Sequence, residues 1–295
     1  MHIPPAAIAY SVLAIGLLCA MDAAVKLVSW QEGVLTATWL RYLFGGLLLI
    51  PAALLMRRRM PDRAGLRIHA LRGLLLTFTS LTFFHGIAVL PLAEAITLAF
   101  VAPLMVPPLA ALFLKERMRG RAALAGALGF IGVIVTVQGA DGSYSEGNRG
   151  LAIASILVSA TLYALQALIL RARAQRDDAI SIAALAGVVP LALLTPAALA
   201  LDGLPATASL PAAALSGALG AAGILILTRA YALAEAQVLI VFEYTGLFWA
   251  ALLGWFIFAE RPRLEIFLGA AIIAGACILV SRAERPAPPA APSAV

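Results

Sequence analysis

Long apolar runs separated by short polar or charged turns fill most of this chain. Ten of the runs are about 19–22 residues long, which is the helix length that crosses a hydrocarbon core of roughly 30 Å. They span residues 8–28, 35–56, 72–91, 95–114, 120–139, 150–171, 179–200, 212–233, 237–258 and 264–282. The pattern therefore predicts an all-α membrane protein with ten transmembrane helices.

The second half of the chain repeats the plan of the first. Residues 91–137 contain an apolar run, a charged turn and a glycine-rich run, and residues 234–280 contain the same parts in the same order. Gly132 and Gly275, one in each glycine-rich run, are 143 residues apart. Nearly constant spacing over so long a segment indicates duplication of one module. We expect these glycines to allow close helix contacts rather than to bind a ligand.

Each copy holds five predicted spans, the first over residues 5–139 and the second over residues 148–283. The Pro/Ala-rich tail, residues 284–295, is predicted to be disordered. Because five is an odd number, the second copy must cross the membrane in the opposite sense. The sequence therefore predicts two inverted five-helix repeats, an architecture that recurs in secondary transporters with a site near the midplane between the halves.

Composition excludes an ordinary soluble domain. Hydrophobic residues make up 63% of the chain and charged residues 12%, about half the charged fraction of an average soluble domain. Cys19 and Cys277 both fall inside apolar runs, so no disulfide framework is predicted. A net charge of +6 would suit nucleic acid in a soluble protein, but here the position of the charges explains it better.

Lysine and arginine are distributed unequally between the two sides of the predicted membrane. The side of the N-terminus collects 15 of them: Arg57, Arg58, Arg59, Arg63, Arg67, Arg72, Lys115, Arg117, Arg119, Arg121, Arg171, Arg173, Arg176, Arg282 and Arg285. The other side has 3: Arg149, Arg261 and Arg263. Because basic loops stay in the cytoplasm, we predict that both termini are cytoplasmic.

These motifs resemble those of the EamA-type drug/metabolite transporter superfamily. The resemblance rests on ALFLKERMRGRAALAGALGFIGV and GWFIFAERPRLEIFLGAAIIAGA, and on the opening segments CAMDAAVKLVS and TWLRYLFGGLLLIP. It extends over residues 5–283. It implies a basket of ten helices whose central cavity is lined mainly by spans one, three, four, six, eight and nine. Members resemble one another in fold but carry amino acids, nucleotide conjugates, vitamins or drugs.

Three ionisable residues, Asp22, Lys26 and Arg41, fall inside the first two predicted spans. Asp22 and Lys26 are four residues apart and share a helix face. Asp22 and Arg41 each lie six residues, about 9 Å, from the outer end of their spans, so an antiparallel hairpin brings them level. Two interpretations stay open: an ion-pair network that fixes the hairpin, or a direct role in substrate or proton handling.

A second charged pair, Arg229 and Glu243, falls on the eighth and ninth predicted spans. The two residues could neutralise each other. Alternatively, Glu243 is the best candidate for a proton-coupling carboxylate, because a charged carboxylate is costly within a membrane. Of the other glutamates, we expect Glu94 to lie at a solvated turn and Glu260 to cap a helix or pair locally.

Five polar or aromatic residues are predicted to bind substrate: His85, Tyr163, Gln166, Tyr244 and Trp249. Four of them fall on spans six and nine, which the resemblance places around the cavity. Aromatic and amide groups there would suit an amphipathic substrate with a flat apolar part. The fifth, the histidine, is the one histidine inside a predicted span. For every member the alternative is a packing or interfacial role.

Three prolines, Pro103, Pro107 and Pro108, interrupt the fourth predicted span. They free backbone carbonyls, which is tolerable only where neighbouring groups or a water-filled cavity satisfy them. We predict a kink that lets this helix flex during transport. The chain departs from the family pattern here, because Pro103 has no proline counterpart in the ninth span, where residues 244–249 stand instead.

The expected function is secondary transport by alternating access, exporting hydrophobic or aromatic amino acids and related small metabolites across a bacterial inner membrane. Uptake or exchange of a charged metabolite, such as a nucleoside-derived sulfonium or a vitamin, is the alternative. A membrane-embedded enzyme is a remote alternative, because no HExxH motif or phosphate-binding glycine loop is present. We expect no catalytic residue, metal or cofactor. The expected partners are a small-molecule substrate and the lipid bilayer, with no nucleic acid, and the chain is expected to be a monomer or a weak homodimer.

Cysteine accessibility tests the predicted orientation. With Cys19 and Cys277 replaced by alanine, single cysteines in 57–71 and in 140–149 should react from opposite sides of the membrane, because an odd number of predicted spans separates them. The measurement is labelling by a membrane-impermeant maleimide in intact cells and in inverted vesicles. Labelling of both segments from the same side would contradict the topology.

Overall fold

A computed structural model describes residues 5–56, 61–102, 104–105, 109, 120–138, 148–173, 177, 179–233 and 245–283. Regular structure within these ranges is helical throughout, as the sequence predicts. The helices are α1 (Pro5–Leu55), α2 (Arg63–Val89), α3 (Leu92–Ala99), α5 (Gly120–Val137), α6 (Arg149–Arg173), α7 (Ala179–Leu201), α8 (Leu210–Leu233), α10 (Thr245–Phe258) and α11 (Leu264–Ala283).

Five of the described helices, α1, α2, α6, α7 and α8, are long and apolar enough to cross a membrane by length and composition. The bounds of α5, α6, α7, α8 and α11 agree with predicted spans to within a few residues. The all-α membrane class is therefore confirmed. The count of ten spans stays a prediction, because parts of the fourth and ninth predicted spans lie outside the described residues.

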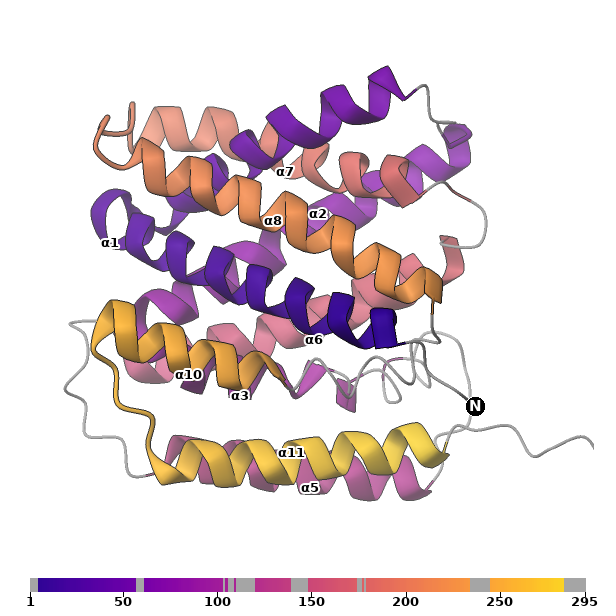
Figure 1. The fold of residues 1–295 in the computed structure, drawn as a ribbon, viewed down its shortest axis with the longest axis vertical. Helices are drawn as coiled ribbons and strands as arrows, with labels where there is room; N and C mark the ends of the chain where they lie inside the picture. The colour runs from indigo at the N-terminus through magenta and orange to yellow at the C-terminus, as the bar shows by residue number, and fades with distance from the viewer. Residues whose placement is uncertain are drawn as a thin grey trace, which may run out of the picture.

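Helix α1 doubles back at Gly33 and so supplies two of the predicted spans. Gly33 has φ 82° and ψ 162°, a backbone conformation that side-chain-bearing residues rarely adopt. The arms on either side, residues 5–32 and 34–55, contain the predicted spans 8–28 and 35–56. Figure 1 shows the first arm running from the N-terminus to the turn and the second arm returning above it.

The helices run roughly side by side across the view of Figure 1 and are stacked in layers. Helices α5 and α11 pair at the bottom, α10 and α3 lie above them, and α7 and the second arm of α1 are at the top. The Gly33 turn, the α7–α8 connection and the α10–α11 connection all lie at the left-hand end of that view. Segments far apart in the sequence therefore meet at one end of the helix stack.

Glycines bring several of these helices into close contact. On α8, a Cβ at Gly217 would stand 2.6 Å from the Gly45 nitrogen, and one at Gly223 would stand 2.9 Å from Leu18 Cδ2. Between α5 and α11, a Cβ at Gly132 would stand 3.0 Å from the Gly269 oxygen. These contacts agree with the predicted role of small residues in helix packing. The prediction is wrong for Gly275, because no atom of the described residues lies within 4 Å of its Cβ position.

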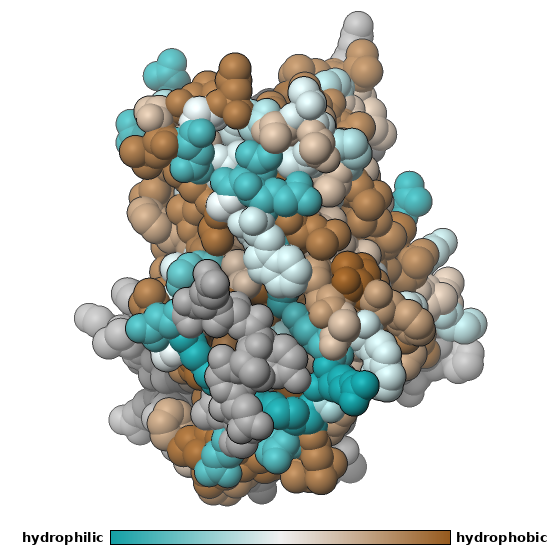
Figure 2. All heavy atoms as spheres, turned by 90° about the vertical axis from the view of Figure 1, so that its left-hand side faces the viewer, coloured by the Kyte–Doolittle hydropathy of each residue, from teal (hydrophilic) through white to brown (hydrophobic). Residues whose placement is uncertain are grey.

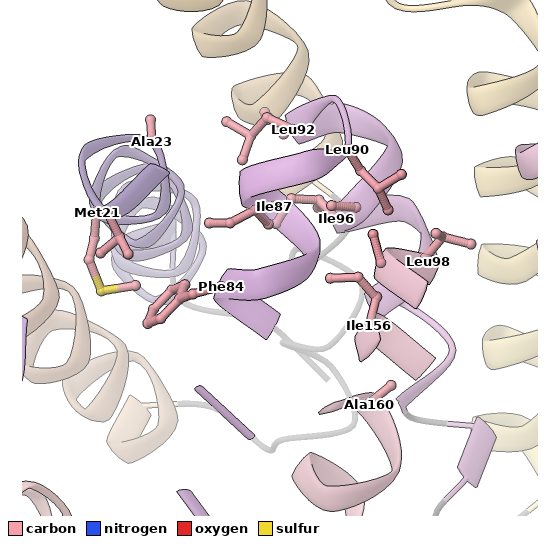
Figure 3. Close-up of a cluster of buried hydrophobic side chains, with 14 of the residues drawn as sticks. Met21, Ala23, Phe84, Ile87, Leu90, Leu92, Ile96, Leu98, Ile156 and Ala160 are labelled. Atoms are coloured by element: carbon pink, nitrogen blue, oxygen red, sulfur yellow. The ribbon is translucent and has the colours of Figure 1, made fainter. Parts of the chain in front are cut away.

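A cluster of buried apolar side chains extends over most of the described helices, and one part of it lies where α1, α2, α3 and α6 meet. Figure 3 shows Ile87 of α2 beside Ile96 of α3, with Ile156 of α6 nearby, and Met21 of α1 and Phe84 of α2 pointing toward each other. Ile87 and Ile156 are fully buried. This cluster fixes the C-terminal part of α2 against the first arm of α1, and so sets the position of the polar groups described next.

Candidate functional site

Asp22 and Arg41 come from the two arms of α1 and lie at the same level of the hairpin. The Arg41 Nε–H group donates to Sδ of Met21, the residue before Asp22, at 3.0 Å. Asp22 is 7% exposed and interacts electrostatically with Arg41. Its carboxylate accepts no hydrogen bond from any residue that the structure describes. The hairpin thus holds two opposite charges close together without using up the hydrogen-bonding capacity of the carboxylate.

Aromatic rings surround the Arg41 guanidinium. Its Cζ lies 4.7 Å from the ring centre of Tyr42 and 5.4 Å from that of Phe84, distances at which a cation is attracted to an aromatic face. The Tyr42 hydroxyl shares a hydrogen bond of 2.7 Å with Ser80 Oγ, which ties the second arm of α1 to α2. We use the name central site for Asp22, Arg41, Tyr42, Ser80 and Phe84.

The central site combines three kinds of recognition. Asp22 can accept hydrogen bonds from an ammonium or attract another cationic group, and the Arg41 guanidinium can donate two parallel hydrogen bonds to a carboxylate. Phe84 and Tyr42 place aromatic faces beside the Arg41 guanidinium. Together these groups suit a small solute that carries opposite charges and a planar part.

Lys26 does not join Asp22 and Arg41, which corrects the network predicted for these three residues. Its ammonium donates instead to Glu260 Oε1 at 2.5 Å and to the Leu90 carbonyl at 2.6 Å. It also lies 5.0 Å from the ring centre of Phe258. The reason is position: Lys26 is one helical turn, about 6 Å, nearer the Gly33 end than Asp22, and its long side chain extends to that end.

The Lys26–Glu260 pair supplies hydrogen-bond partners for backbone groups at the break between α2 and α3. The chain is extended at Leu90 and Pro91, which leaves the Leu90 carbonyl and the Leu92 amide without helical partners. Lys26 donates to the carbonyl, and Glu260 Oε2 accepts from the Leu92 amide at 2.7 Å. Glu260 therefore pairs with distant segments, and the prediction of a local cap is wrong.

Backbone geometry at the end of α10 turns Glu260 inward. Ala259 has φ 55°, a strained conformation for alanine, and the Glu260 amide then donates to the Gly254 carbonyl at 3.0 Å. Gly254 leaves room for the carboxylate, because a Cβ there would stand 2.8 Å from Glu260 Oε2. Local strain of this kind persists where surrounding contacts hold it.

Glu94, in the first turn of α3, is fully buried between two arginines, so the prediction of a solvated turn is wrong. Arg149 Nη2 donates to its Oε1 at 2.6 Å, and Arg263 Nη2 donates to its Oε2 at 3.2 Å. Arg263 Nη1 also donates to the Gln138 carbonyl at the end of α5, at 2.5 Å. One carboxylate thus connects α3, α5, α6 and the segment before α11.

We use the name ion-pair cluster for Lys26, Glu94, Arg149, Glu260 and Arg263. Figure 2 shows the end of the molecule that contains the Gly33 turn, where hydrophilic residues gather over the middle and hydrophobic residues surround them. The sequence contained one signal for this cluster. Two of the three arginines predicted in loops on this side, Arg149 and Arg263, are those that pair with Glu94.

The predicted substrate-binding residues lie in several places. His85 is partly buried on α2, and Gln166 is 5% exposed on α6. Tyr163 leaves half of its surface exposed on α6. The Trp249 indole of α10 packs over Gly16 of α1, and its Nε1 has no hydrogen-bond partner. Substrate binding by these four residues stays a prediction.

Several predicted residues lie outside the described part of the chain: Glu243, Tyr244, Pro103, Pro107 and Pro108. Arg229 is exposed on α8, and its pairing with Glu243 stays a prediction. Proton coupling through Glu243 and a flexing kink in the fourth span also stay predictions. Within the described residues, no group of three or more His, Cys, Asp or Glu side chains could hold a metal ion.

The EamA-like transporter family matches residues 6–138. An S-adenosylmethionine uptake transporter of Rickettsia felis is 23% identical over 84% of this chain and 82% of its own length. The pseudopaline exporter CntI of Pseudomonas aeruginosa is 27% identical over 90% of this chain and 92% of its own. A riboflavin transporter of Rhizobium johnstonii is 30% identical over 68% of this chain and 65% of its own.

The chain belongs to the EamA-type drug/metabolite transporter superfamily. A solved crystal structure shares its fold with a TM-score of 0.60 at 18% identity, covering 93% of this chain and 99% of the other. As a member of this superfamily, the chain is a multi-pass bacterial membrane protein whose relatives are named as transporters, not as enzymes. The names of those relatives do not support export of amino acids in particular.

Replacing Glu94 by glutamine tests the ion-pair cluster. The change keeps the size of the side chain but leaves Arg149 and Arg263 without their shared carboxylate, which should cost about 3–5 kcal/mol. The measurement is the apparent melting temperature of the purified protein in detergent. Glu265→Gln is the matched control, because Glu265 lies at the start of α11 and makes no ion pair with the described residues. Equal melting temperatures for the two variants would contradict the assignment.

Proposed function

We propose that this transporter moves a small solute carrying opposite charges and a planar group, through alternating access at the central site. The observation that carries the proposal is the Asp22–Arg41 pair beside Tyr42 and Phe84, enclosed between α1 and α2. A charged metabolite with a ring satisfies this chemistry, and so does an aromatic amino acid. The relatives named for S-adenosylmethionine, pseudopaline and riboflavin support a charged or ring-bearing metabolite at least as well as an amino acid.

The proposed architecture is ten transmembrane helices in two inverted five-helix repeats, with both termini cytoplasmic in the inner membrane. Helix contacts support the repeat. The Ala14 oxygen lies 3.4 Å from the Cβ position of Gly223, and Ser159 Oγ donates to the Thr79 carbonyl at 3.0 Å. Ser159 lies 145 residues after Ala14, and Gly223 lies 144 residues after Thr79. Ala14 thus corresponds to Ser159, and Thr79 corresponds to Gly223. The contact between α1 and α8 therefore has the same place in the repeat as the contact between α2 and α6.

The ion-pair cluster closes one end of the proposed transport path. It joins α1 and α3 of the first repeat to Arg149, Glu260 and Arg263 of the second. In an inverted-repeat transporter, access alternates when the halves rock about the site between them. We propose that the described arrangement is closed at the cluster end, which is the predicted periplasmic end, and that these ion pairs separate when that end opens.

Transport assays with three solutes test the proposal. Proteoliposomes are loaded in turn with S-adenosylmethionine, riboflavin or phenylalanine, and counterflow of the labelled solute is measured. Riboflavin, which has a ring but no opposite charges, is the comparison solute. If S-adenosylmethionine or phenylalanine is transported, Asp22→Asn and Arg41→Gln should each lower its rate on the order of tenfold or more, because a hydrogen bond to a charged group is worth about 1.5–3 kcal/mol. Arg67→Gln, which changes an exposed arginine of α2, should leave the rate unchanged.

Two outcomes would contradict the proposal. One is the absence of counterflow with all three solutes in protein that is monodisperse and has the wild-type melting temperature. The other is transport by Asp22→Asn or Arg41→Gln at the wild-type rate.

A further inference from the structure

Arg72 is a buried cation that no acidic side chain among the described residues neutralises. The sequence places it at the end of a basic loop, but the structure places it nine residues inside α2, which begins at Arg63 rather than at the predicted residue 72. Arg72 is 8% exposed. Its Nε and Nη1 atoms have no hydrogen-bond partner, and no ion pair to a described residue compensates them. A buried, unpaired charge is costly, so its retention requires a reason.

The surroundings of Arg72 lead toward the central site. The phenol groups of Tyr42 and Tyr163, from the second arm of α1 and from α6, interact electrostatically with its guanidinium. The Arg41 guanidinium lies against the ring face of the same Tyr42, so this tyrosine lies between Arg41 and Arg72. Along α2, Arg72 is 12 residues from Phe84, about 18 Å. The two arginines therefore lie at different levels along α2 and mark separate positions.

A second polar side chain on the same helix face adds to the site. His69 lies three residues before Arg72 and is 2% exposed. Its Nε2 lies 2.9 Å from Asp177 Oδ2, which fixes the ring, while its Nδ1 has no partner. Residues three apart on a helix are neighbours. Two buried side chains with unused nitrogen atoms thus lie next to each other near the start of α2, at the end predicted to be cytoplasmic.

We propose that Arg72 is a second anion-binding position, which holds an oxyanion group such as the carboxylate of the solute between the cytoplasmic end and the central site. The inference deepens the proposed function and rests on it. The anion exchanges its contact with Arg72 for a contact with Arg41 as the solute moves past Tyr42. The planar guanidinium accounts for selectivity, because it donates paired hydrogen bonds to a carboxylate and offers nothing to an uncharged amide of the same shape.

Benzoate and benzamide form a matched pair of probes, since they differ in charge but hardly in shape. Dissociation constants are measured by ligand-observed NMR on the full chain in detergent. Wild-type protein should bind benzoate more tightly than benzamide. Arg72→Gln should weaken benzoate binding on the order of tenfold and leave benzamide unchanged, Arg72→Lys should retain part of the preference, and Arg67→Gln should retain all of it.

Stability supplies an independent readout. Because the Arg72 guanidinium has no partner to lose, Arg72→Gln without probe should melt at or above the wild-type temperature. A large fall in melting temperature, or failure to fold, would show that Arg72 holds the structure together and would overturn the proposal. So would an unchanged benzoate affinity in Arg72→Gln, or equal or undetectable binding of both probes by the wild type.

Two further results separate the possible sources of the anion and the two proposals. If phosphatidylglycerol copurifies with the wild type but not with Arg72→Gln, and adding it back displaces benzoate, a lipid phosphate occupies the position and the solute role is overturned. If counterflow fails for all three solutes but Arg72 still governs benzoate binding, the transport proposal fails and the anion position stands. If transport requires Arg41 but not Arg72, and the wild type shows no preference for benzoate over benzamide, the transport proposal stands and the anion position is overturned.

Discussion

The Lys26–Glu260 ion pair is the interaction on which the arrangement of the helices depends. A chain that breaks a helix inside a membrane protein must satisfy the freed carbonyl and amide groups, since no water is available to do so. Lys26 satisfies the Leu90 carbonyl, Glu260 satisfies the Leu92 amide, and the two charges compensate each other. Either residue alone would leave a buried charge and an unsatisfied backbone group. The break between α2 and α3 is therefore stable only when α1 and the α10–α11 connection are both in place.

This dependence connects stability to transport. The residues that satisfy the break come from opposite halves of the chain, and Glu94 adds a second link between the halves through Arg149 and Arg263. Ion pairs suit a surface that must both close and open, because water can solvate their charges once they separate. An apolar contact of similar size would expose hydrophobic surface on opening. In the proposed transport cycle the cluster is a closure that opens, whereas the glycine contacts between α8 and α1 stay closed.

The sequence predicted what depends on local pattern. Apolar length and charge spacing located α5, α6, α7, α8 and α11 to within a few residues, and the level of Asp22 with Arg41 followed from counting helical rise. Partners 55 to 234 residues away were beyond such reasoning. Glu94 and Glu260 were placed in solvent or in local contacts, because a charged residue beside a turn has the same local pattern whether it is solvated or buried by a distant segment.

Helix ends were a second limit. The predicted span begins at Arg72 because the residues before it are too polar and basic for an apolar run, so the first nine residues of α2 were not recognised as helix. Asp62, whose side chain accepts from the Gly65 amide at 2.8 Å, was the available signal for the earlier start, since aspartate favours the position before a helix. A helix that begins after this cap includes His69 and Arg72.

The most direct test of this account measures opening at the ion-pair cluster. Spin labels at residues 204 and 261, in a protein without Cys19 and Cys277, report the separation of the two sides of that end by pulsed electron paramagnetic resonance. Residue 204 moves with α1, because Thr36 Oγ1 donates to Asp202 at 2.7 Å and Glu32 accepts from the Ala206 amide at 3.0 Å. If the ion-pair cluster holds this end closed, the wild type should show one short distance, and Glu94→Gln should show a longer, additional distance. A single unchanged distance in both proteins would contradict it.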